Sequence, residues 1–307
     1  NMRINIPGLW FMSWYDVSVG PNVEMYSIVR RTAKGDAANQ QWMIIAPVAH
    51  CSYTRATEHT VVGDRDMGDA RLGYQEIMYA FFDKFLKGNA TSAIDTMPKV
   101  RYYVMGENKW HSSDVWPPRG AEGMTFYLGS GGKANTLNGD GTLSLKAPAK
   151  NTPDNFTYDP ANPVMSHGGN VCCQGNAVGA GAMDQRGTES RPDVLVYTSD
   201  PFKDGIELTG PITPTLYVSS DAKDTDFTVK LVDVYPPNAD YPTGIEINVA
   251  DGIVRGRYRK GPGTAELLKP GQAYEFTIET YPTSLVFKKG HRIRVDVSSS
   301  NFPRFDV

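Results

Sequence analysis

Two residues near the start of the chain, Asp16 and His50, have the types and positions that acyl-transfer chemistry needs. Each comes shortly after an apolar run of strand length, Gly8–Met12 before Asp16 and Gln41–Pro47 before His50. A neutral imidazole accepts a proton near neutral pH, and a neighbouring carboxylate fixes its tautomer and stabilises the imidazolium. The order Asp then His is that of the last two members of an α/β-hydrolase triad, whose nucleophile comes earlier. On these residues alone, a capping Asp and a surface His remain the alternative.

The segments around this pair predict a strand, a helix and a second strand. Apolar residues three and four positions apart in Pro21–Arg31, with basic residues at its end, are typical of an amphipathic helix. A right-handed crossover makes the two strands parallel and brings their carboxyl ends to one edge of the sheet, where open α/β sheets place their active sites. We therefore expect Asp16 and His50 to lie together. A strongly apolar helix, Tyr74–Leu86, is expected to pack on the same sheet.

The sequence pattern does not supply the nucleophile of such a triad. No serine lies in a Gly-x-Ser-x-Gly turn, and the nearest imitation, Leu-Gly-Ser-Gly-Gly around Ser130, is typical of a strand that runs into a turn. Either the triad interpretation is wrong or its serine precedes residue 1. Residues that flank the pair could line a substrate pocket, although aromatic residues at strand ends more often pack. These candidates are Trp14, Tyr15, Cys51 and Tyr53.

The composition limits the partners and the cofactors. Lys and Arg number 31 against 34 Asp and Glu, and the resulting net charge of −3 argues against nucleic acid or an anionic membrane as a partner. The apolar runs are far shorter than the roughly 20 residues of a membrane helix. Cys51, Cys172 and Cys173 fit neither a disulfide framework nor a zinc motif, which predicts free or buried thiols. The Asp-rich segments 64–69 and 221–226 are expected to be polar loops rather than cation sites.

The chain is long enough for two cores, and its pattern changes near residue 97. We predict a first domain of α/β type over residues 1–97 and a second, all-β domain over residues 98–307. Short β-rich segments separated by Gly, Pro and Asn in the second domain predict an antiparallel sandwich or jelly roll. The expected strands are Val100–Met105, Thr125–Leu128, Val194–Tyr197, Ile206–Leu208, Thr215–Ser219, Phe227–Val234, Tyr274–Ile278 and Arg292–Ser298.

A series of short stretches spread over nearly the whole chain forms a specific pattern when taken in order. They are Trp14–Asp16, Ala46–His50, Phe81–Gly88, Val104–Trp110, Trp116–Pro118, Tyr158–Pro160, Arg191–Tyr197, Asp224–Phe227, Gly252–Arg259, Gly290–Arg294 and Ser298–Arg304. Together they resemble the cocaine esterase and X-prolyl dipeptidyl-peptidase superfamily of serine hydrolases, often labelled CocE/NonD, which includes α-amino acid ester hydrolases and glutaryl acylases. The family's usual Gly-Pro-Trp-x-His is Ala-Pro-Val-Ala-His here, so the His is retained and Val48 replaces the aromatic residue.

The resemblance implies a fold and a set of site residues. The fold is the C-terminal part of an α/β-hydrolase domain followed by a jelly-roll β-sandwich. Asp16 matches the triad acid and His50 the triad base, and no metal or organic cofactor is implied. The elbow serine, the oxyanion-hole tyrosine and a helical cap are expected upstream. The chain is also expected to stop before the jelly roll is complete.

The function that the resemblance implies for the complete protein is hydrolysis of a small-molecule ester, amide or peptide through an acyl-enzyme. The 307-residue chain alone is expected to be inactive. Within this class, X-prolyl dipeptidyl-peptidase and β-lactam acylase or α-amino acid ester hydrolase are alternatives. From another class, the alternative is a non-catalytic, carbohydrate-type jelly-roll binding module with a degenerate hydrolase remnant. Relatives include secreted and cytoplasmic members that commonly self-associate, so a homo-oligomer is an option and the location is not fixed.

Overall fold

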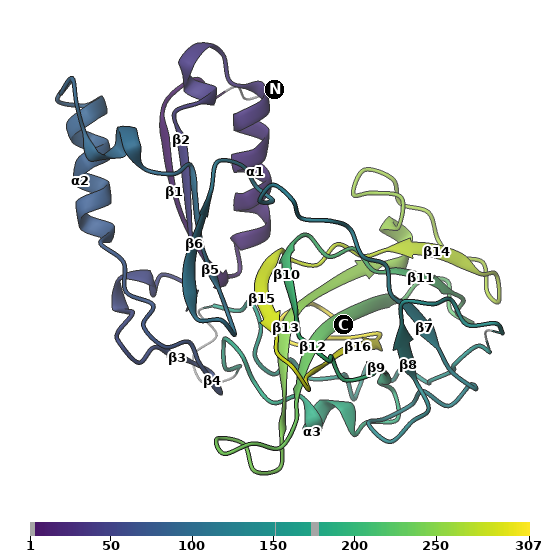
Figure 1. The fold of residues 1–307 in the computed structure, drawn as a ribbon. Helices are drawn as coiled ribbons and strands as arrows, with labels where there is room; N and C mark the ends of the chain where they lie inside the picture. The colour runs from purple at the N-terminus through teal and green to yellow at the C-terminus, as the bar shows by residue number, and fades with distance from the viewer. Residues whose placement is uncertain (1–3, 151, 173–177) are drawn as a thin grey trace.

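The structure is a computed structural model that describes residues 4–150, 152–172 and 178–307. Figure 1 shows two parts, a small sheet flanked by helices near the N-terminus and a larger β-rich part formed by the rest of the chain. Of the three cysteines, Cys173 lies outside the described residues.

The small sheet has the strand order β1-β2-β5-β6. β1 and β5 run parallel to β2, and β6 runs antiparallel to β5. Because α1 connects β1 to β2, the expected strand–helix–strand unit is confirmed. The elements of this part are β1 (Gly8–Tyr15), α1 (Val19–Thr32), η1 (Gly35–Ala38), β2 (Gln41–Ala49), η2 (Tyr53–Arg55), β3 (Val61–Val62), β4 (Arg65–Asp66), α2 (Tyr74–Phe85), η3 (Ala93–Thr96), β5 (Val100–Val104) and β6 (Lys109–Ser113).

The two long helices cover opposite faces of the small sheet. Successive residues of a strand alternate between the faces, and paired residues of neighbouring strands share one. Trp10 pairs with Met43, so it lies on the face opposite to Trp42. Trp10 contacts Tyr26 of α1, with ring centroids 6.4 Å apart, whereas Trp42 contacts Phe81 of α2 at 6.1 Å. The expected packing of α2 on the sheet is confirmed, and Figure 1 shows the helices on either side.

The larger part is a β-sandwich, as the sequence predicts. One sheet has the order β13-β12-β16-β9-β8-β7, and the ladders β10–β15 and β11–β14 provide further strands. Phe227 of β12 packs against Phe276 of β14, with ring centroids 5.1 Å apart. The elements are β7 (Tyr127–Gly129), β8 (Thr142–Ser144), α3 (Arg186–Glu189), β9 (Leu195–Ser199), β10 (Ile206–Gly210), β11 (Thr215–Val218), β12 (Asp226–Tyr235), β13 (Ile245–Arg255), η4 (Gly256–Tyr258), β14 (Tyr274–Thr277), β15 (Thr283–Phe287) and β16 (Arg292–Ser298).

The first strand expected in the sandwich belongs to the small sheet instead. β5 pairs in parallel with β2, where Met43 lies opposite Val100 and Ile45 opposite Tyr102. The small sheet therefore continues to Ser113, past the boundary expected between residues 97 and 98. In β5, Val100, Tyr102, Tyr103 and Val104 are buried and only Arg101 is partly exposed, which is typical of a strand covered on both faces.

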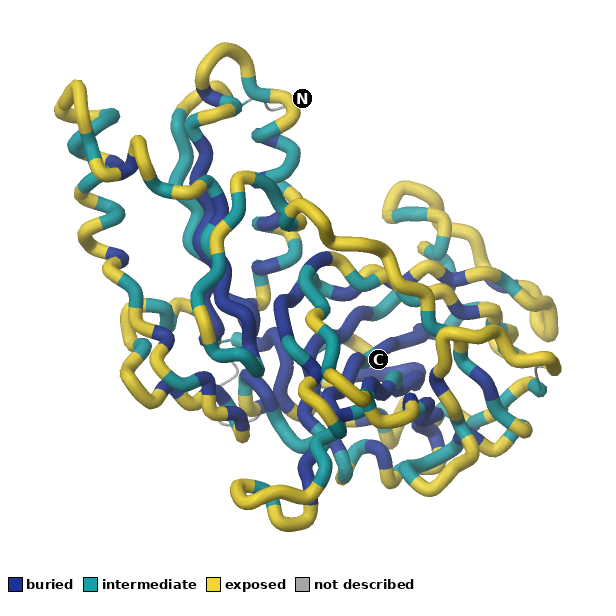
Figure 2. Tube along the Cα trace, in the orientation of Figure 1, coloured by how far each residue is buried: buried dark blue, intermediate teal, exposed yellow. Residues whose placement is uncertain are grey.

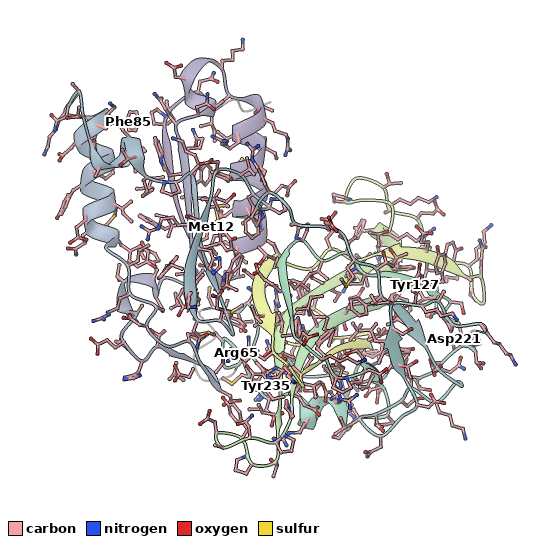
Figure 3. All side chains as sticks on the ribbon, viewed as in Figure 1. Met12, Arg65, Phe85, Tyr127, Asp221 and Tyr235 are labelled. Carbon is pink, nitrogen blue, oxygen red and sulfur yellow. The ribbon has the colours of Figure 1, made fainter. Side chains whose placement is uncertain are left out.

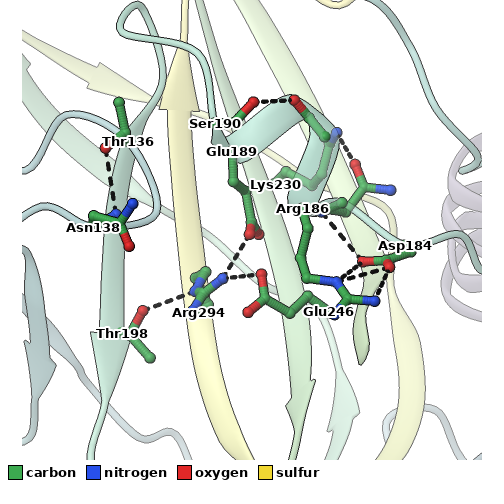
Figure 4. A network of polar contacts seen from close by, with 12 residues as sticks. Thr136, Asn138, Asp184, Arg186, Glu189, Ser190, Thr198, Lys230, Glu246 and Arg294 are labelled. Atoms are coloured by element: carbon green, nitrogen blue, oxygen red, sulfur yellow. Dashed lines mark hydrogen bonds and ion pairs between the residues drawn. The ribbon is translucent and has the colours of Figure 1, made fainter. Parts of the chain in front are cut away.

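Burial extends to both faces of the six-stranded sheet. Figure 2 shows the buried segments concentrated in the strands and the exposed ones in the connections. On β16, Ile293 and Val297 are buried, and the polar residues between them, Arg294 and Asp296, are buried as well. Figure 4 shows one result, in which Arg294 donates to Glu189 at 2.6 Å and also binds Glu246. The face of the six-stranded sheet that carries Arg294 is therefore covered, and it holds charged residues rather than facing water.

No helix in the described part of the chain is long and apolar enough to cross a membrane. In the same part of the chain, no group of three or more His, Cys, Asp and Glu side chains is placed to hold a metal ion.

Candidate active site

Asp16 is the first residue after β1, and a short turn fixes its carboxylate. Oδ1 accepts hydrogen bonds from the backbone N–H and from the hydroxyl of Ser18, both at 2.7 Å. This is the Asx-turn geometry that Asp favours directly before a helix, and α1 begins at Val19. The other carboxylate oxygen, Oδ2, is left to face the end of the neighbouring strand.

His50 is the first residue after β2, and its ring meets that oxygen. His50 Nδ1 lies 2.9 Å from Asp16 Oδ2. The prediction that the two residues lie together is confirmed, because parallel pairing of Tyr15 with Ala49 brings both strand ends to the same edge. With Nδ1–H donating to the carboxylate, the lone pair of the ring is on Nε2. The imidazole is half-buried, so Nε2 is available to a partner outside the pair.

The β-sandwich part holds the backbone of the Asp16 turn. The amide of Asn170 donates to the carbonyl oxygens of Trp14, at 2.5 Å, and Asp16, at 3.1 Å. Asn170 is 1% exposed, so these bonds are shielded from water. The hydroxyl of Tyr281 donates to the carbonyl of Val17 at 2.9 Å. The candidate acid is therefore fixed from both parts of the molecule.

Two of the predicted pocket residues point into the interior. Trp14 is 2% exposed, and its indole donates to the carbonyl of Tyr103 at 2.7 Å. Tyr15 is fully buried and donates to the carbonyl of Asn248 at 3.2 Å. Burial raises the pKa of the Tyr15 hydroxyl. These contacts favour packing roles for both side chains at the junction with the sandwich over direct contact with a substrate.

The other two predicted pocket residues lie beside His50. Cys51 is exposed, and its Sγ is 3.2 Å from His50 Nε2. Tyr53 is half-buried and stacks on Phe11 with ring centroids 5.3 Å apart, next to Tyr74 at 5.1 Å. Contact of either with a substrate stays a prediction, and of the two Cys51 has the more accessible side chain.

Other serines and histidines that resemble members of a triad have partners of their own. The hydroxyl of Ser130 donates to Asp154 at 2.6 Å within the sandwich. His291 bonds Asp233 at 2.8 Å and is buried, as a structural histidine would be. Ser52, two residues after His50, donates to the backbone carbonyl of His50 at 3.2 Å.

Sequence reasoning missed Ser18 and Asn170. Ser18 carries a usable signal, because a serine two residues after an Asp at a helix start favours an Asx turn. Asn170 carries none, since 154 positions separate it from Asp16. The arrangement as a whole is an oriented imidazole whose Nε2 points away from the carboxylate and can accept a proton from a nucleophile and return it to a leaving group.

Comparison with known proteins places the chain in a family. The family model described as "X-Pro dipeptidyl-peptidase C-terminal non-catalytic domain" matches residues 92–307. Over 98% of its length the chain is 40% identical to the cocaine esterase of Rhodococcus sp. (strain MB1 Bresler), of which it covers 50%. The chain thus spans about half the length of this curated relative.

Solved structures agree with this assignment. An α-amino acid ester hydrolase is 29% identical with a TM-score of 0.82, over 97% of this chain and 48% of that one. An aminopeptidase from the marine sediment archaeon Thaumarchaeota archaeon is 26% identical with a TM-score of 0.80, over 99% of this chain and 49% of that one. The resemblance to CocE/NonD hydrolases, and to their C-terminal portion, is confirmed. By its match over residues 92–307, the chain belongs to the family of the X-Pro dipeptidyl-peptidase C-terminal non-catalytic domain.

Proposed function

We propose that this chain supplies the acid and the base of a serine hydrolase of carboxylic esters or amides, within a longer polypeptide that supplies the serine. The observation that carries the proposal is the 2.9 Å contact between His50 Nδ1 and Asp16 Oδ2 at the ends of two parallel strands. Both residues precede residue 92, so they lie outside the region whose family description is non-catalytic. The relatives named as an esterase, an ester hydrolase and an aminopeptidase support acyl transfer as the reaction class.

In the proposed mechanism the nucleophilic serine attacks the carbonyl carbon of the substrate, and its proton passes to His50 Nε2. Asp16 keeps Nδ1–H oriented and stabilises the imidazolium. The imidazolium then gives the proton to the leaving alcohol or amine, which leaves an acyl-enzyme. A water molecule repeats the two proton transfers and releases the acid. No step requires a metal or an organic cofactor.

The open side of the small sheet supports a longer catalytic domain of α/β-hydrolase type. Among the described strands, β1 pairs only with β2, so its second edge has no neighbour. Helix α2 leaves Tyr79, Phe82 and Leu86 exposed by 66%, 47% and 76%. An apolar strand edge and an apolar helix face are normally covered. We infer that further strands of the same polypeptide continue the sheet beside β1.

The binding-module alternative predicts no role for the pair. A non-catalytic sandwich is compatible with both functions, because Asp16 and His50 precede residues 92–307 in the sequence in either case. The oriented imidazole favours the hydrolase, since a remnant gains nothing from holding Asp16 by Ser18 and Asn170.

Substitution in the complete polypeptide tests the proposal. We expect Asp16→Asn and His50→Gln each to lower kcat on a p-nitrophenyl ester by about 10³- to 10⁴-fold, with little change in KM. His59→Gln, at an exposed histidine close in sequence, is the control and is expected to retain activity. Turnover that survives in either triad variant would refute the proposal. A fluorophosphonate probe should label the complete polypeptide but not this 307-residue chain.

A further inference from the structure

Cys51 lies against the ring nitrogen of His50 that Asp16 does not use. Its Sγ is 3.2 Å from Nε2, while Nδ1 is 2.9 Å from the carboxylate. Because Nδ1 donates to Asp16, Nε2 is the acceptor and the thiol S–H is the donor in the contact with Cys51. The three side chains thus form a continuous chain from thiol to imidazole to carboxylate.

Such a chain activates a thiol. The thiolate is the reactive form, and an adjacent imidazole that is held by a carboxylate removes the proton. Cys51 is exposed, so a reagent can reach its sulfur. Its backbone has φ of 53°, a left-handed conformation that is uncommon for a cysteine and that occurs at functional sites. These observations are independent of each other and concern the same residue.

We propose that Cys51 is a reactive thiol that small-molecule disulfides modify, and that the modification blocks His50. The thiol proton passes to Nε2, and the sulfur attacks one sulfur of the disulfide. The disulfide bond breaks as the Cys51 mixed disulfide forms, so Cys51 is oxidised while the other half of the reagent leaves as a reduced thiolate. The imidazolium releases its proton to water.

The second half of this proposal rests on the proposed function, and the first half does not. A group attached to Cys51 Sγ stands next to Nε2, at the position from which a nucleophilic serine would have to deliver its proton. Modification of Cys51 would then stop acyl transfer, and a reductant would restore it. The reactivity of the thiol itself can be measured without any substrate of the hydrolase.

The first experiment uses the 307-residue chain with Cys172→Ser and Cys173→Ser, so that Cys51 is its only cysteine. Reaction with 5,5′-dithiobis(2-nitrobenzoate) at pH 7 is followed by the release of thionitrobenzoate. We expect His50→Gln to slow the reaction about tenfold, Asp16→Asn to slow it as well, and the control His59→Gln to leave it unchanged. An equal rate in His50→Gln, or no reaction at Cys51, would overturn the proposal.

A second measurement does not need the Cys172→Ser and Cys173→Ser substitutions. The unaltered chain and its His50→Gln variant are treated briefly with iodoacetamide, and the labelled fraction of the Cys51 peptide is measured by mass spectrometry. The same tenfold difference is expected. Circular dichroism of each variant confirms that a slow reaction is not due to unfolding, and an equal labelled fraction in folded variants contradicts the proposal.

The complete polypeptide tests the block of His50. Treatment with the disulfide reagent is expected to remove at least nine-tenths of the turnover, on the order of a tenfold loss, and dithiothreitol to restore it. In Cys51→Ser, the ratio of treated to untreated turnover is expected to stay near one. Modification at Cys51 without loss of turnover would refute the block while leaving the thiol reactivity standing. Inactive untreated enzyme with a reactive thiol would instead count against the proposed function.

Discussion

The buried ion pair between Arg65 and Asp233 ties the small sheet to the sandwich, and Asp233→Asn should break that tie. Arg65 Nη2 donates to Asp233 Oδ2 at 2.9 Å, and His291 Nδ1 bonds the other oxygen at 2.8 Å. Arg65 lies on β4, in the connection from β2 to α2, whereas Asp233 lies on β12. Figure 3 shows Arg65 beside Tyr235 at this junction.

The structure sets the size of the effect. Asp233 is 1% exposed and Arg65 is 2% exposed, so neither charge can be solvated by water. Among the described residues, Arg65 Nε and Nη1 have no hydrogen-bond partner, which makes Asp233 the main compensation for the guanidinium. Removing one member of a buried pair costs about 3–5 kcal/mol. At about 1.4 kcal/mol per factor of ten, the unfolding constant should rise by about two to four orders of magnitude.

Urea unfolding followed by tryptophan fluorescence measures this change. With a slope of about 3 kcal/mol per molar urea, the midpoint should fall by about 1–1.7 M. The matched control is Asp69→Asn, which breaks the 2.7 Å pair with Arg71 on the same connection. Both of those side chains are about half exposed, so the expected loss is under about 1 kcal/mol.

Comparing the two variants shows whether the burial of an ion pair determines how much stability is lost when it is broken. If Asp233→Asn loses no more stability than Asp69→Asn, burial does not determine the strength of the Arg65 pair and the reasoning fails. Should Asp233→Asn not fold, Arg65→Met combined with Asp233→Leu removes both charges. Because apolar side chains of similar volume often replace a buried pair without loss, this double variant is expected to fold.

Two further predictions concern buried polar groups. Asn170→Ala leaves the carbonyls of Trp14 and Asp16 without their donor, so urea unfolding should show a loss of stability of about 1–3 kcal/mol. In the complete polypeptide, kcat should fall with KM unchanged. An unchanged kcat would show that Asn170 does not position Asp16. Burial raises the pKa of Glu189 from its ordinary value of 4.5 to about 11. Between pH 4.5 and 11 the folded state therefore keeps a proton on Glu189 that the unfolded state releases. The free energy of unfolding then falls as pH rises through this range. In Glu189→Gln the side-chain oxygen still accepts from Arg294, and the loss of stability per pH unit should be smaller than in the parent by up to about 1.4 kcal/mol. If the urea midpoints of parent and variant fall equally between pH 6 and pH 9, the prediction is wrong.

The Asp16–His50 contact could be predicted because it follows from short-range patterns. Two apolar runs with a helical segment between them specify parallel strands, and parallel strands with a right-handed crossover end at the same edge. The helix α1 was expected over residues 21–31 and spans Val19–Thr32. None of these steps needs information from distant parts of the chain.

Strand β13 was missed because its alternation of apolar and polar residues breaks after Val249, at a shift in register opposite Leu231 and Val232. Asn248 and Asp251 are buried within it, and Gly252 follows directly. A Cβ on Gly252 would lie 2.5 Å from the carbonyl oxygen of Glu279, so only glycine fits where the chains approach closely. Alternation of apolar and polar residues identifies a strand only while its register is regular, and in β13 it fails beyond the shift.

The sequence also could not show that the side chains of Trp14 and Tyr15, predicted to line a pocket, are buried. The two residues lie where the register of β1 with β2 shifts after Ser13, and the sequence does not say what covers either side chain. Trp14 packs against Trp116, with ring centroids 5.8 Å apart, and Tyr15 reaches the backbone of Asn248 in the sandwich. Their burial depends on contacts more than 90 positions away in sequence, so only the tertiary structure could reveal it.

The sandwich also bears on how the proposed acid would work. A carboxylate can hold an imidazole in one tautomer only if its own position is fixed to within a few tenths of an ångström. Ser18 fixes the side chain of Asp16 from the local turn, but the turn is anchored by Asn170 and Tyr281, which come from the region described as non-catalytic. That region would therefore act on catalysis without touching the substrate, by restricting the turn that carries Asp16. If Asp16 and His50 act as proposed, this positioning role gives residues 92–307 a part in catalysis although they include neither the acid nor the base.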